Sequence, residues 1–574
     1  MSALSTTTKP GPRCLLIADF TVDGLVPYLE SEAPAPQIRC ITTPFAQVNR
    51  LLLDGSAEWW NPRPELALVW TRPDSAIQSF GRLVAGDDVV LDEILNDVEK
   101  FAQRLVTAST RVGTMLVPSW TVPATDRGLG VLNLNKQRGF AYHLMRMNAK
   151  LVELTSDTTN IIILDAGRWV ALSGSRASNP KLWYMGKIAF GPDVLRRAAQ
   201  DIKVASRAIT GRTRKLVVLD LDDTLWGGIV GDVGWEGLRL GGHDPRGEAF
   251  CAFQRALMAL SRRGVILGIV SKNTESVALE AIQRHPDMVL RLSDFAGWRI
   301  NWQDKAANVA ALATELRLGL DAVVFIDDSP VERARLRQAL PDVLTPDWPS
   351  DSMLYEHALK ELDCFEGIAV SDEDRRRTEM YVTERARRQG ATTGDLADYL
   401  RSLELRVLVE PLSRVNLERA CQLLNKTNQM NLKTRRFTER EYWEWAQDSA
   451  HRVFTFRVAD RFGEYGLTAV AGVTMKGGIA LVDDFVLSCR VMGRGVEEAV
   501  LHVLVEHARL ERCTSLHAHL VPSSRNEPCR QFFDGQSGFL RRDDQYEWET
   551  DNRYPAPGHV QIISETLPTV VGSS

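Results

Sequence analysis

A short apolar run followed by closely spaced acids constrains the fold more than any other feature of the chain. Residues 216–219 have the sequence Leu-Val-Val-Leu, which predicts a buried strand, and Asp220 and Asp222 follow it with one residue between them. Because side chains alternate along an extended chain, both carboxylates are expected on the same side, at the carboxyl end of the strand. Open α/β sheets bind their ligands at that end. Two convergent acids can hold a divalent cation there and still leave one oxygen free as a nucleophile.

Matching features recur further along the chain. They are a second apolar run (265–270) that ends at Ser271 and is followed by Asn273, a lone ammonium at Lys305, and a third apolar run (323–326) followed by Asp327 and Asp328. A hydroxyl at a strand end can donate to a phosphoryl oxygen, and magnesium prefers hard oxygen ligands that it often shares with a phosphate. The order of these features therefore indicates a site that handles phosphate.

This series of residues resembles the haloacid dehalogenase (HAD) superfamily of phosphotransferases. The resemblance implies that Asp220 attacks phosphorus and that Asp222 is the general acid and base. It also implies that Thr224 steadies the loop, while Ser271 and Lys305 hold the transferring phosphoryl group. Magnesium would be coordinated by Asp220, the backbone carbonyl of Asp222, Asp327 and Asp328. Phosphoryl transfer depends mainly on in-line positioning and on neutralised oxygens, which such a set of groups supplies.

Further motifs are similar to the FkbH-like branch of the superfamily (subfamily IIIC). They include Thr-Leu-Trp-Gly-Gly-Ile-Val-Gly at 224–231, Ser-Lys-Asn at 271–273, Phe-Ala-Gly-Trp-Arg-Ile-Asn-Trp at 295–302 and Asp-Asp-Ser-Pro at 327–330. The resemblance covers residues 214–381 closely. It implies that 1,3-bisphosphoglycerate is dephosphorylated and that the glyceryl group passes to the phosphopantetheine thiol of an acyl carrier protein, as a polyketide building unit. Trp226 and Asn273 are expected to contact the substrate.

One position departs from this family pattern. Many family members carry a cysteine just before the Ser-Lys-Asn motif, as a carrier of the acyl group, and Val270 stands there in this chain. Cys251 and Cys364 are candidate substitutes, although a free cysteine is more often a small buried hydrophobe. Three outcomes stay open: direct transfer to the carrier, another acyl substrate, or hydrolysis alone. The alternative function is therefore a HAD phosphatase of a small phosphate ester, and a non-catalytic carrier adaptor is a third possibility.

The region before the HAD-like part, residues 13–205, alternates strand and helix signals, which predicts a parallel α/β domain. It loosely resembles SGNH hydrolases. In that family a Gly-Asp-Ser follows the first strand and supplies the nucleophile, whereas this chain has Asp19, Phe20 and Thr21 after its first predicted strand. We therefore expect a structural or docking domain that lacks hydrolase activity.

The region after the HAD-like part, residues 385–545, resembles the GNAT acyltransferase fold. A glycine turn that opens a predicted helix carries Arg490, Gly493, Arg494 and Gly495. Backbone N–H groups at a helix N-terminus suit a phosphate, so this turn is expected to bind coenzyme A or the pantetheine arm of the carrier. Earlier in this region, Asn425, Asn428 and Asn431 are expected to serve turn and cap chemistry, with the lining of an acyl pocket as the alternative. Residues 555–574 are expected to form a loose tail.

Length and composition agree with a multidomain protein. The 574 residues suggest about three to four domains. A net charge of −5 gives no basic footprint for nucleic acid, and no apolar run is long enough to span a membrane. The eight cysteines are scattered, which favours a reducing, cytoplasmic location. The predicted fold class is thus α/β and multidomain: a HAD-type, Rossmann-like parallel sheet flanked by an SGNH-hydrolase-like α/β domain and a GNAT-like α+β domain.

Overall fold

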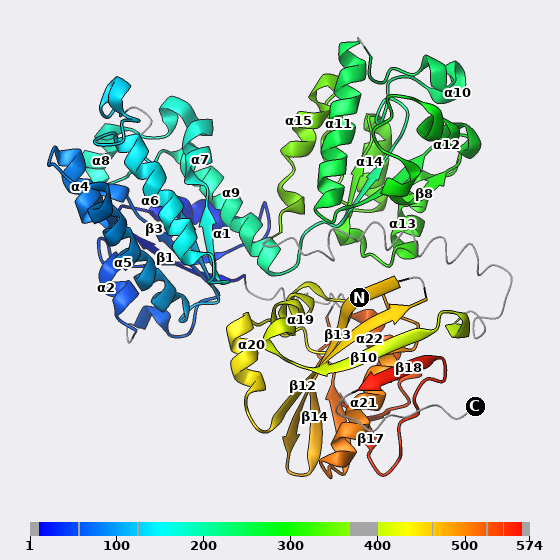
Figure 1. Cartoon of the computed structure of the whole chain (residues 1–574). Helices are drawn as coiled ribbons and strands as arrows, with labels where there is room; N and C mark the ends of the chain where they lie inside the picture. The colour runs from blue at the N-terminus through cyan, green and yellow to red at the C-terminus, as the bar shows by residue number, and fades with distance from the viewer. Residues whose placement is uncertain are drawn as a thin grey trace, which may run out of the picture. The chain divides into compact units, whose positions relative to one another are not determined.

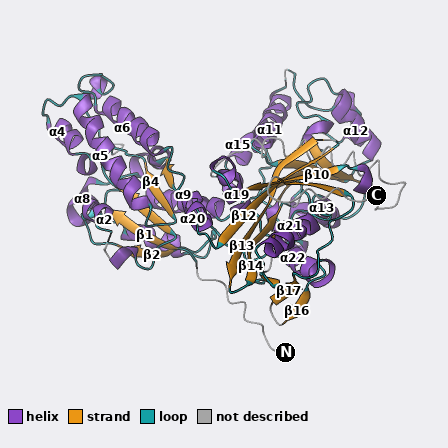
Figure 2. Cartoon of the chain, turned by 60° about the horizontal axis from the view of Figure 1, so that its bottom comes forward, coloured by secondary structure: helices purple, strands orange, loops and turns teal. Residues whose placement is uncertain are grey.

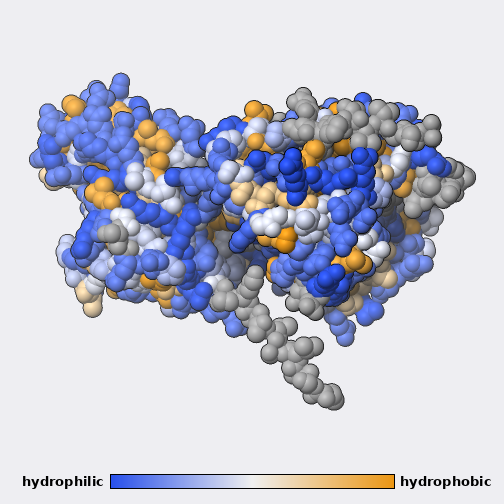
Figure 3. Space-filling view, turned by 90° about the horizontal axis from the view of Figure 1, so that it is seen from below, coloured by the Kyte–Doolittle hydropathy of each residue, from blue (hydrophilic) through white to orange (hydrophobic). Residues whose placement is uncertain are grey.

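The computed structural model describes residues 11–367 and 400–564, apart from 56–57, 123–125, 243, 462, 489, 524–525 and 543–544. The chain divides into two compact units, one up to Arg207 and the other from Ala208 onward. The face shown in Figure 3 is mostly hydrophilic, and its hydrophobic side chains lie in small separate groups. Within the described residues, no helix is long and apolar enough to cross a membrane.

The first unit contains a five-stranded sheet in the order β2-β1-β3-β4-β5, and every pairing is parallel. Its strands are β1 (Arg13–Ala18), β2 (Arg39–Thr42), β3 (Leu66–Trp70), β4 (Thr114–Pro118) and β5 (Ile161–Leu164). Its helices are α1 (Val26–Glu30), α2 (Val48–Leu53), α3 (Pro73–Ala76), α4 (Gln78–Ala85), α5 (Leu91–Ser109), α6 (Phe140–Thr155), α7 (Ala166–Ser173), α8 (Pro180–Gly186) and most of α9 (Pro192–Ile209). Strands β3 and β4 are buried along their whole length, as the continuous apolar runs of parallel sheets require.

The second unit begins with a four-stranded parallel sheet in the order β8-β7-β6-β9 (Figure 1). Its strands are β6 (Leu216–Leu219), β7 (Ile266–Ser271), β8 (Phe295–Ile300) and β9 (Val323–Ile326). Its helices are α10 (Val230–Val233), α11 (Pro245–Arg262), α12 (Glu275–Arg284), α13 (Lys305–Glu315), α14 (Pro330–Ala339) and α15 (Tyr355–Lys360). Because β6 pairs with both β7 and β9, the three carboxyl ends that carry the predicted site lie side by side. The predicted α/β fold class is confirmed.

The same unit continues with a nine-stranded, mainly antiparallel sheet (Figure 2). The order is β16-β17-β15-β14-β13-β12-β10-β18, and β11 pairs with β14 outside this path. The strands are β10 (Leu405–Pro411), β11 (Met430–Asn431), β12 (His451–Asp460), β13 (Gly463–Lys476), β14 (Ile479–Leu487), β15 (Ser515–His519), β16 (Leu540–Arg542), β17 (Gln545–Glu549) and β18 (Val560–Ser564). The helices are α19 (Arg414–Lys426), α20 (Glu439–Ala446), α21 (Val496–Leu510) and α22 (Glu527–Gln531).

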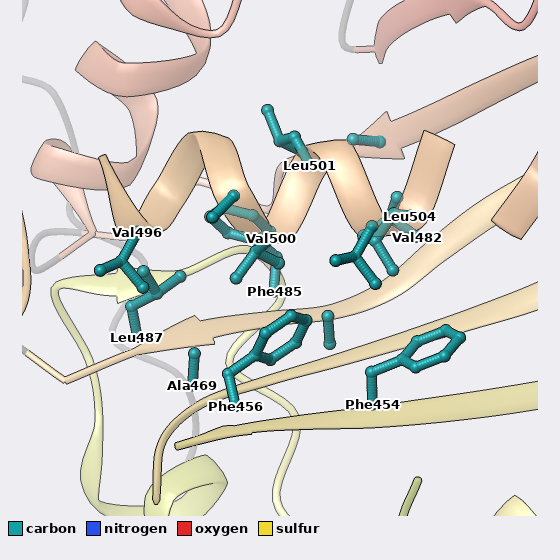
Figure 4. Packing of buried hydrophobic residues seen from close by; sticks show 14 of the residues in the cluster. Phe454, Phe456, Ala469, Val482, Phe485, Leu487, Val496, Val500, Leu501 and Leu504 are labelled. Atoms are coloured by element: carbon teal, nitrogen blue, oxygen red, sulfur yellow. The ribbon is translucent and has the colours of Figure 1, made fainter. Parts of the chain in front are cut away.

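Helix α21 packs on this sheet through one apolar face. Val496, Val500 and Leu504 point from the helix toward the sheet, where Phe485 and Leu487 of β14 lie (Figure 4). The helix carries these residues at intervals of four, so they fall on one side of it. Burial of this face ties the turn before α21 to the sheet.

The sheet extends beyond the boundary predicted at residue 545. Strand β18 pairs in parallel with β10, so the prediction of a loose tail from 555 onward is wrong for residues 560–564. A five-residue strand next to a stretch rich in Pro and Gly gives too short a periodic signal to be recognised alone. The boundaries predicted at 381 and 385 lie outside the described residues.

Candidate active site

Three acids meet at the carboxyl edge of the four-stranded sheet. Asp220 directly follows β6, and Asp327 and Asp328 directly follow the neighbouring strand β9. One carboxylate oxygen from each of the three lies within 4.8 Å of the others. The Asp220 amide donates to the Ile326 carbonyl at 3.0 Å, so the strand pairing continues up to the site. Asp220 Oδ1 is buried and accepts no hydrogen bond from any described residue.

Lys305 supplies the cation of this cluster. Its Nζ lies 3.0 Å from Asp220 Oδ2 and 2.6 Å from Asp327 Oδ2, and its side chain is 5% exposed. Asp304 caps α13 by accepting the Ala307 N–H at 3.0 Å, which fixes Lys305 as the first residue of that helix. Burial opposes a charged ammonium, but Asp220 and Asp327 outweigh it, so the pKa of Lys305 is raised.

The cluster carries more negative than positive charge, because three carboxylates face one ammonium. Burial, and after it the charge of Asp220, raise the pKa of Asp327 to about 6 and also raise the pKa of Asp328. A divalent cation would relieve this excess, and a set made only of carboxylate oxygens suits magnesium. The unpartnered oxygen of Asp220 adds an available ligand. The residues present therefore fit a magnesium ion.

Asp222 lies beside the cluster in a network of its own. Its Oδ1 accepts hydrogen bonds from the Trp226 indole at 2.9 Å and the Val230 amide at 3.0 Å, and its Oδ2 accepts one from the Asn273 side chain at 2.8 Å. Burial raises the pKa of Asp222, which is the direction that a proton-donating carboxyl group needs.

Trp226 and Asn273, expected to contact the substrate, both point at Asp222 instead. Trp226 has no exposed surface, so it cannot touch a bound substrate, and its role is to orient Asp222. Asn273 is 4% exposed, and its amide oxygen accepts the Thr274 N–H. Trp226 is therefore a positioning residue in this structure, whereas substrate contact by Asn273 stays a prediction.

Thr224 joins the two acidic loops, in the loop-steadying role expected from the sequence. Its hydroxyl donates to Asp328 Oδ1 at 3.3 Å and accepts the Asp328 N–H at 3.1 Å. Arg333 supports the same loop by donating to the carbonyls of Asp327 at 2.7 Å and Asp328 at 2.6 Å. No role for Arg333 was predicted from the sequence.

Ser271 ends β7, the strand beside β6, and is 2% exposed. Val270, one residue earlier, has no exposed surface and packs with Leu216 and Val218 in the core. The Cys251 thiol is buried and donates to the Asp287 carbonyl at 3.4 Å, and burial raises its pKa. Cys364 is half-buried and packs against the core. Position 270 thus supplies no thiol, and burial works against activation of the Cys251 thiol.

Replacing Asn273 by Ala is expected to slow phosphate release by about 10²-fold, because Asp222 loses the donor that fixes its second oxygen. The measurement is the kcat of phosphate release at saturating substrate. Asn308→Ala is the matched control, since Asn308 is equally buried but pairs with Asn301. A rate that falls equally in both variants would show a general loss of stability rather than a role in positioning.

Residues 34–204 match the family model described as FkbH, N-terminal domain. The N-terminal part of the protein BF1531 from Bacteroides fragilis, which contains a phosphatase domain and is complexed with Mg, is similar in structure with 26% identity and a TM-score of 0.57. That similarity covers 63% of this chain and 95% of the other. These two matches support an FkbH-like HAD protein.

Two acetyltransferases also match part of the FkbH-like chain in structure. A mutant of the spermidine N-acetyltransferase SpeG from Vibrio cholerae matches 25% of this chain and 94% of its own, with 13% identity and a TM-score of 0.21. The ribosomal-protein-S18-alanine N-acetyltransferase from Escherichia coli matches 25% and 90%, with 13% identity and a TM-score of 0.20. No curated protein matches the chain in sequence.

In the glycine turn before α21, the groups expected to bind a phosphate already form hydrogen bonds with side chains of the protein. Gly493 and Gly495 have φ angles of 70° and 84°, and the Gly493 N–H donates to Glu497 Oε1 at 2.6 Å. Arg494 is 5% exposed and donates to the Tyr465 hydroxyl. Arg490 donates to Ser488 Oγ at 2.9 Å. A phosphate at this helix N-terminus would face the Glu497 carboxylate, so pantetheine binding here stays a prediction.

Glu497→Gln is expected to stabilise this domain at high pH. Burial raises the pKa of Glu497 to about 7, above the ordinary value of 4.5. Such a group favours folding at low pH, and this contribution is lost as the pH rises through that window. The variant should therefore unfold a few degrees higher than the wild type at about pH 8, with a smaller difference at about pH 5. The control in thermal unfolding is Glu464→Gln, because Glu464 is exposed; a shift that is equal at both pH values would contradict the prediction.

The three asparagines before this turn act within their own segment, as expected. The Asn425 side chain binds both the N–H and the carbonyl of Phe437, at 3.1 and 2.7 Å. Asn431 accepts the Thr434 N–H at 2.7 Å and donates to the Thr427 carbonyl at 3.0 Å. Asn428 accepts from Arg436 at 2.5 Å. These contacts hold the segment in place. Asn428 also lines a cavity of about 650 Å³ that Arg490 shares, so an acyl pocket at this segment stays a prediction.

Proposed function

We propose that the FkbH-like chain dephosphorylates 1,3-bisphosphoglycerate and transfers the glyceryl group to the phosphopantetheine thiol of an acyl carrier protein. The observation that carries the phosphatase part is the cluster of Asp220, Lys305, Asp327 and Asp328 at the carboxyl edge of the HAD sheet. The FkbH match and the similarity to a phosphatase domain complexed with Mg support it.

Two different bonds have to break, because a glyceryl group keeps neither phosphate of 1,3-bisphosphoglycerate. The ester phosphate suits Asp220, whose Oδ1 has no hydrogen bond among the described residues. The Asp220 carboxylate attacks phosphorus and the P–O bond to the glyceryl oxygen breaks. Protonated Asp222 gives its proton to that oxygen. Asp222 then takes a proton from the water that attacks the aspartyl phosphate, and inorganic phosphate leaves. Both carboxylates end as they began.

Lys305 and the magnesium ligands serve to neutralise the negative charge of the phosphoryl oxygens in this scheme. Lys305 lies against Asp220 and can balance negative charge on the transferring phosphoryl group. Magnesium bound by Asp220, the Asp222 carbonyl, Asp327 and Asp328 would supply further neutralisation of those oxygens. The Trp226 and Asn273 donors keep the Asp222 carboxylate directed while its proton moves.

The acyl phosphate has to react at carbon. The carrier thiol attacks the carbonyl carbon, the C–O bond to phosphate breaks, and the thiol proton ends on the released phosphate. Attack by Asp220 on that phosphorus would instead release a free acid and lose the activation. Positioning of the substrate must therefore present the ester phosphate to Asp220 and the acyl carbon to the thiol.

A specific observation favours the alternative, a HAD phosphatase of a small phosphate ester without acyl transfer. Val270 packs in the core, and the Cys251 thiol is buried with a raised pKa. An enzyme thioester therefore has no evident carrier among these positions. Direct transfer to the thiol of the carrier protein needs no such cysteine, so the two functions differ in whether a carrier becomes acylated.

Intact-mass analysis of the protein and a phosphopantetheinylated carrier protein decides between them. Both are incubated with magnesium and freshly generated 1,3-bisphosphoglycerate. A glyceryl mass gain on the carrier supports the proposal, and a matching gain on the enzyme would point to a cysteine intermediate. Phosphate release with neither protein modified would leave the phosphatase alone. Neither phosphate release nor modification would contradict both functions.

A further inference from the structure

A loop of the first unit displays apolar side chains to solvent. Leu129, Val131, Leu132 and Leu134 are 39%, 97%, 58% and 66% exposed. Single exposed apolar residues are ordinary on protein surfaces, but four within six positions form a patch. These residues lie in the connection between β4 and α6, and α6 packs on α5 (Figure 1).

The loop is ordered by its own hydrogen bonds, so the exposure does not come from a collapsed or frayed segment. The Asn133 carbonyl accepts the N–H groups of Ala141 at 3.1 Å and Tyr142 at 3.2 Å. The Asn135 carbonyl accepts the Gly139 N–H at 2.8 Å, and the Asn135 amide donates to Leu132 at 2.8 Å. A side chain on Gly139 would lie 2.4 Å from the Asn133 carbonyl oxygen, so this close fold requires glycine. The backbone thus holds the apolar side chains outward.

The exposed side of α6, the helix that follows this loop, also carries apolar side chains. Met145 is 55% exposed, Val152 is 48% exposed, and Ala149 between them is also exposed. Spacings of four and three place these residues on one side of the helix, while Met147 and Leu151 are buried on the other. The loop residues Leu129, Val131, Leu132 and Leu134, with Met145 and Val152, are called the 129–152 surface below.

The 129–152 surface belongs to a basic stretch of the chain. Residues 126–153 contain five basic and two acidic residues, a net charge of +3, in a chain whose net charge is −5. The basic residues are Arg127, Lys136, Arg138, Arg146 and Lys150, and the acidic ones are Asp126 and Glu153. Arg138 pairs with Asp88 at 3.3 Å, whereas the other four basic residues form no ion pair with any described residue. The patch is therefore both apolar and basic.

We propose that the 129–152 surface docks an acidic protein and, resting on the proposed function, that this partner is the acyl carrier protein. Acidic residues of the partner complement the four unpaired basic side chains, which directs the encounter, and its apolar side chains cover Val131 and Leu132. Met145 adapts to a partner surface because its side chain is flexible. An anionic membrane would use the same charges, but none of the six apolar residues that define the 129–152 surface is a Trp, Tyr or Phe that would anchor in a bilayer interface.

The test is a comparison of the full chain with a Val131→Asp/Leu132→Asp double variant in binding to a panel of phosphopantetheinylated acyl carrier proteins. The double variant is expected to bind at least about tenfold more weakly, and Lys136→Glu should also weaken binding without adding charge to an apolar site. Phosphate release in the absence of carrier should be unchanged. Leu53→Asp is the matched control, because Leu53 is 62% exposed on α2, outside the 129–152 surface.

Several results would overturn the docking proposal. They are equal affinity of the wild type and the double variant, no binding of any carrier by the wild type, and binding of anionic vesicles that the double variant loses while carrier binding stays. A lower unfolding temperature with normal carrier binding would also overturn it, since the loop would then be covered within the protein. Carrier that binds through this surface without becoming acylated would instead contradict the proposed function and leave the docking proposal standing. Normal acylation of the carrier by the double variant would contradict the docking proposal and leave the proposed function standing.

Discussion

Asp220→Asn is expected to lower the release of phosphate from the substrate ester by about 10⁴-fold or more, the scale seen when a nucleophile is removed. Asn has nearly the same shape as Asp but lacks the charge that attacks phosphorus. Lys305 keeps Asp327 as a partner at 2.6 Å, so the variant should fold. In the transfer reaction, attack of the carrier thiol on the acyl carbon does not need Asp220. The carrier should therefore collect a glyceryl group that still bears its ester phosphate.

The measurement combines phosphate release with intact mass of the carrier. Asp223→Asn is the matched control: Asp223 is exposed, accepts the Gly228 N–H at 2.8 Å, and lies outside the cluster of three acids. Its φ of 52° suits Asn as well as Asp, so little change is expected. Full ester dephosphorylation by Asp220→Asn would contradict the assignment of the nucleophile. An unmodified carrier in both variants and the wild type would contradict transfer but not phosphatase activity.

The acids of the site could be predicted from the sequence because their placement follows from local rules. Asp220, Asp327 and Ser271 each lie at the end of an apolar run, and the carboxyl ends of parallel strands share one edge. Lys305 could be placed only by resemblance, since nothing local distinguishes it from a surface lysine. Its burial between two carboxylates depends on how α13 packs.

Contacts across long stretches of chain escaped prediction. The Tyr355 hydroxyl donates to the Asp223 carbonyl at 3.2 Å, and nothing near either residue signals this pairing. Trp226 was expected at the substrate because the motif places it beside the acids, but the turn after Asp222 directs its indole inward. Position 270 was singled out by the family pattern, while the structure buries Val270 in the core of the sheet. Such outcomes depend on packing, which residue spacing alone does not determine.

Lys305→Met is expected to have the second large effect, on stability as well as on rate. The substitution leaves Asp220 and Asp327 facing each other without the ammonium between them, and their side chains are only 9% and 0% exposed. Breaking a buried pair costs about 3–5 kcal/mol because a charge is left uncompensated. Loss of a cation beside the phosphoryl group should also slow phosphate release by about 10²–10³-fold.

The same variant should show a defined dependence on pH. Burial and Asp220 already raise the pKa of Asp327 to about 6, and removal of Lys305 removes a charge that opposes this rise. An acid whose pKa is raised in the folded protein favours folding at low pH and loses that contribution as the pH increases. The destabilisation by Lys305→Met should therefore be larger at about pH 8 than at about pH 5. Added magnesium should restore part of it, since the ion supplies positive charge to the same carboxylates.

Urea unfolding of Lys305→Met and Lys272→Met at both pH values tests this directly. Lys272 pairs with Glu332 at 2.7 Å, but the lysine side chain is 40% exposed. Solvent screening leaves such a surface pair worth about 0–1 kcal/mol, so the same substitution should change stability little there. If the two variants lost equal stability, the buried position of Lys305 would not be what makes it matter. If Lys305→Met were destabilised more at low pH, protonation of the acids would not be relieving the loss of the ammonium.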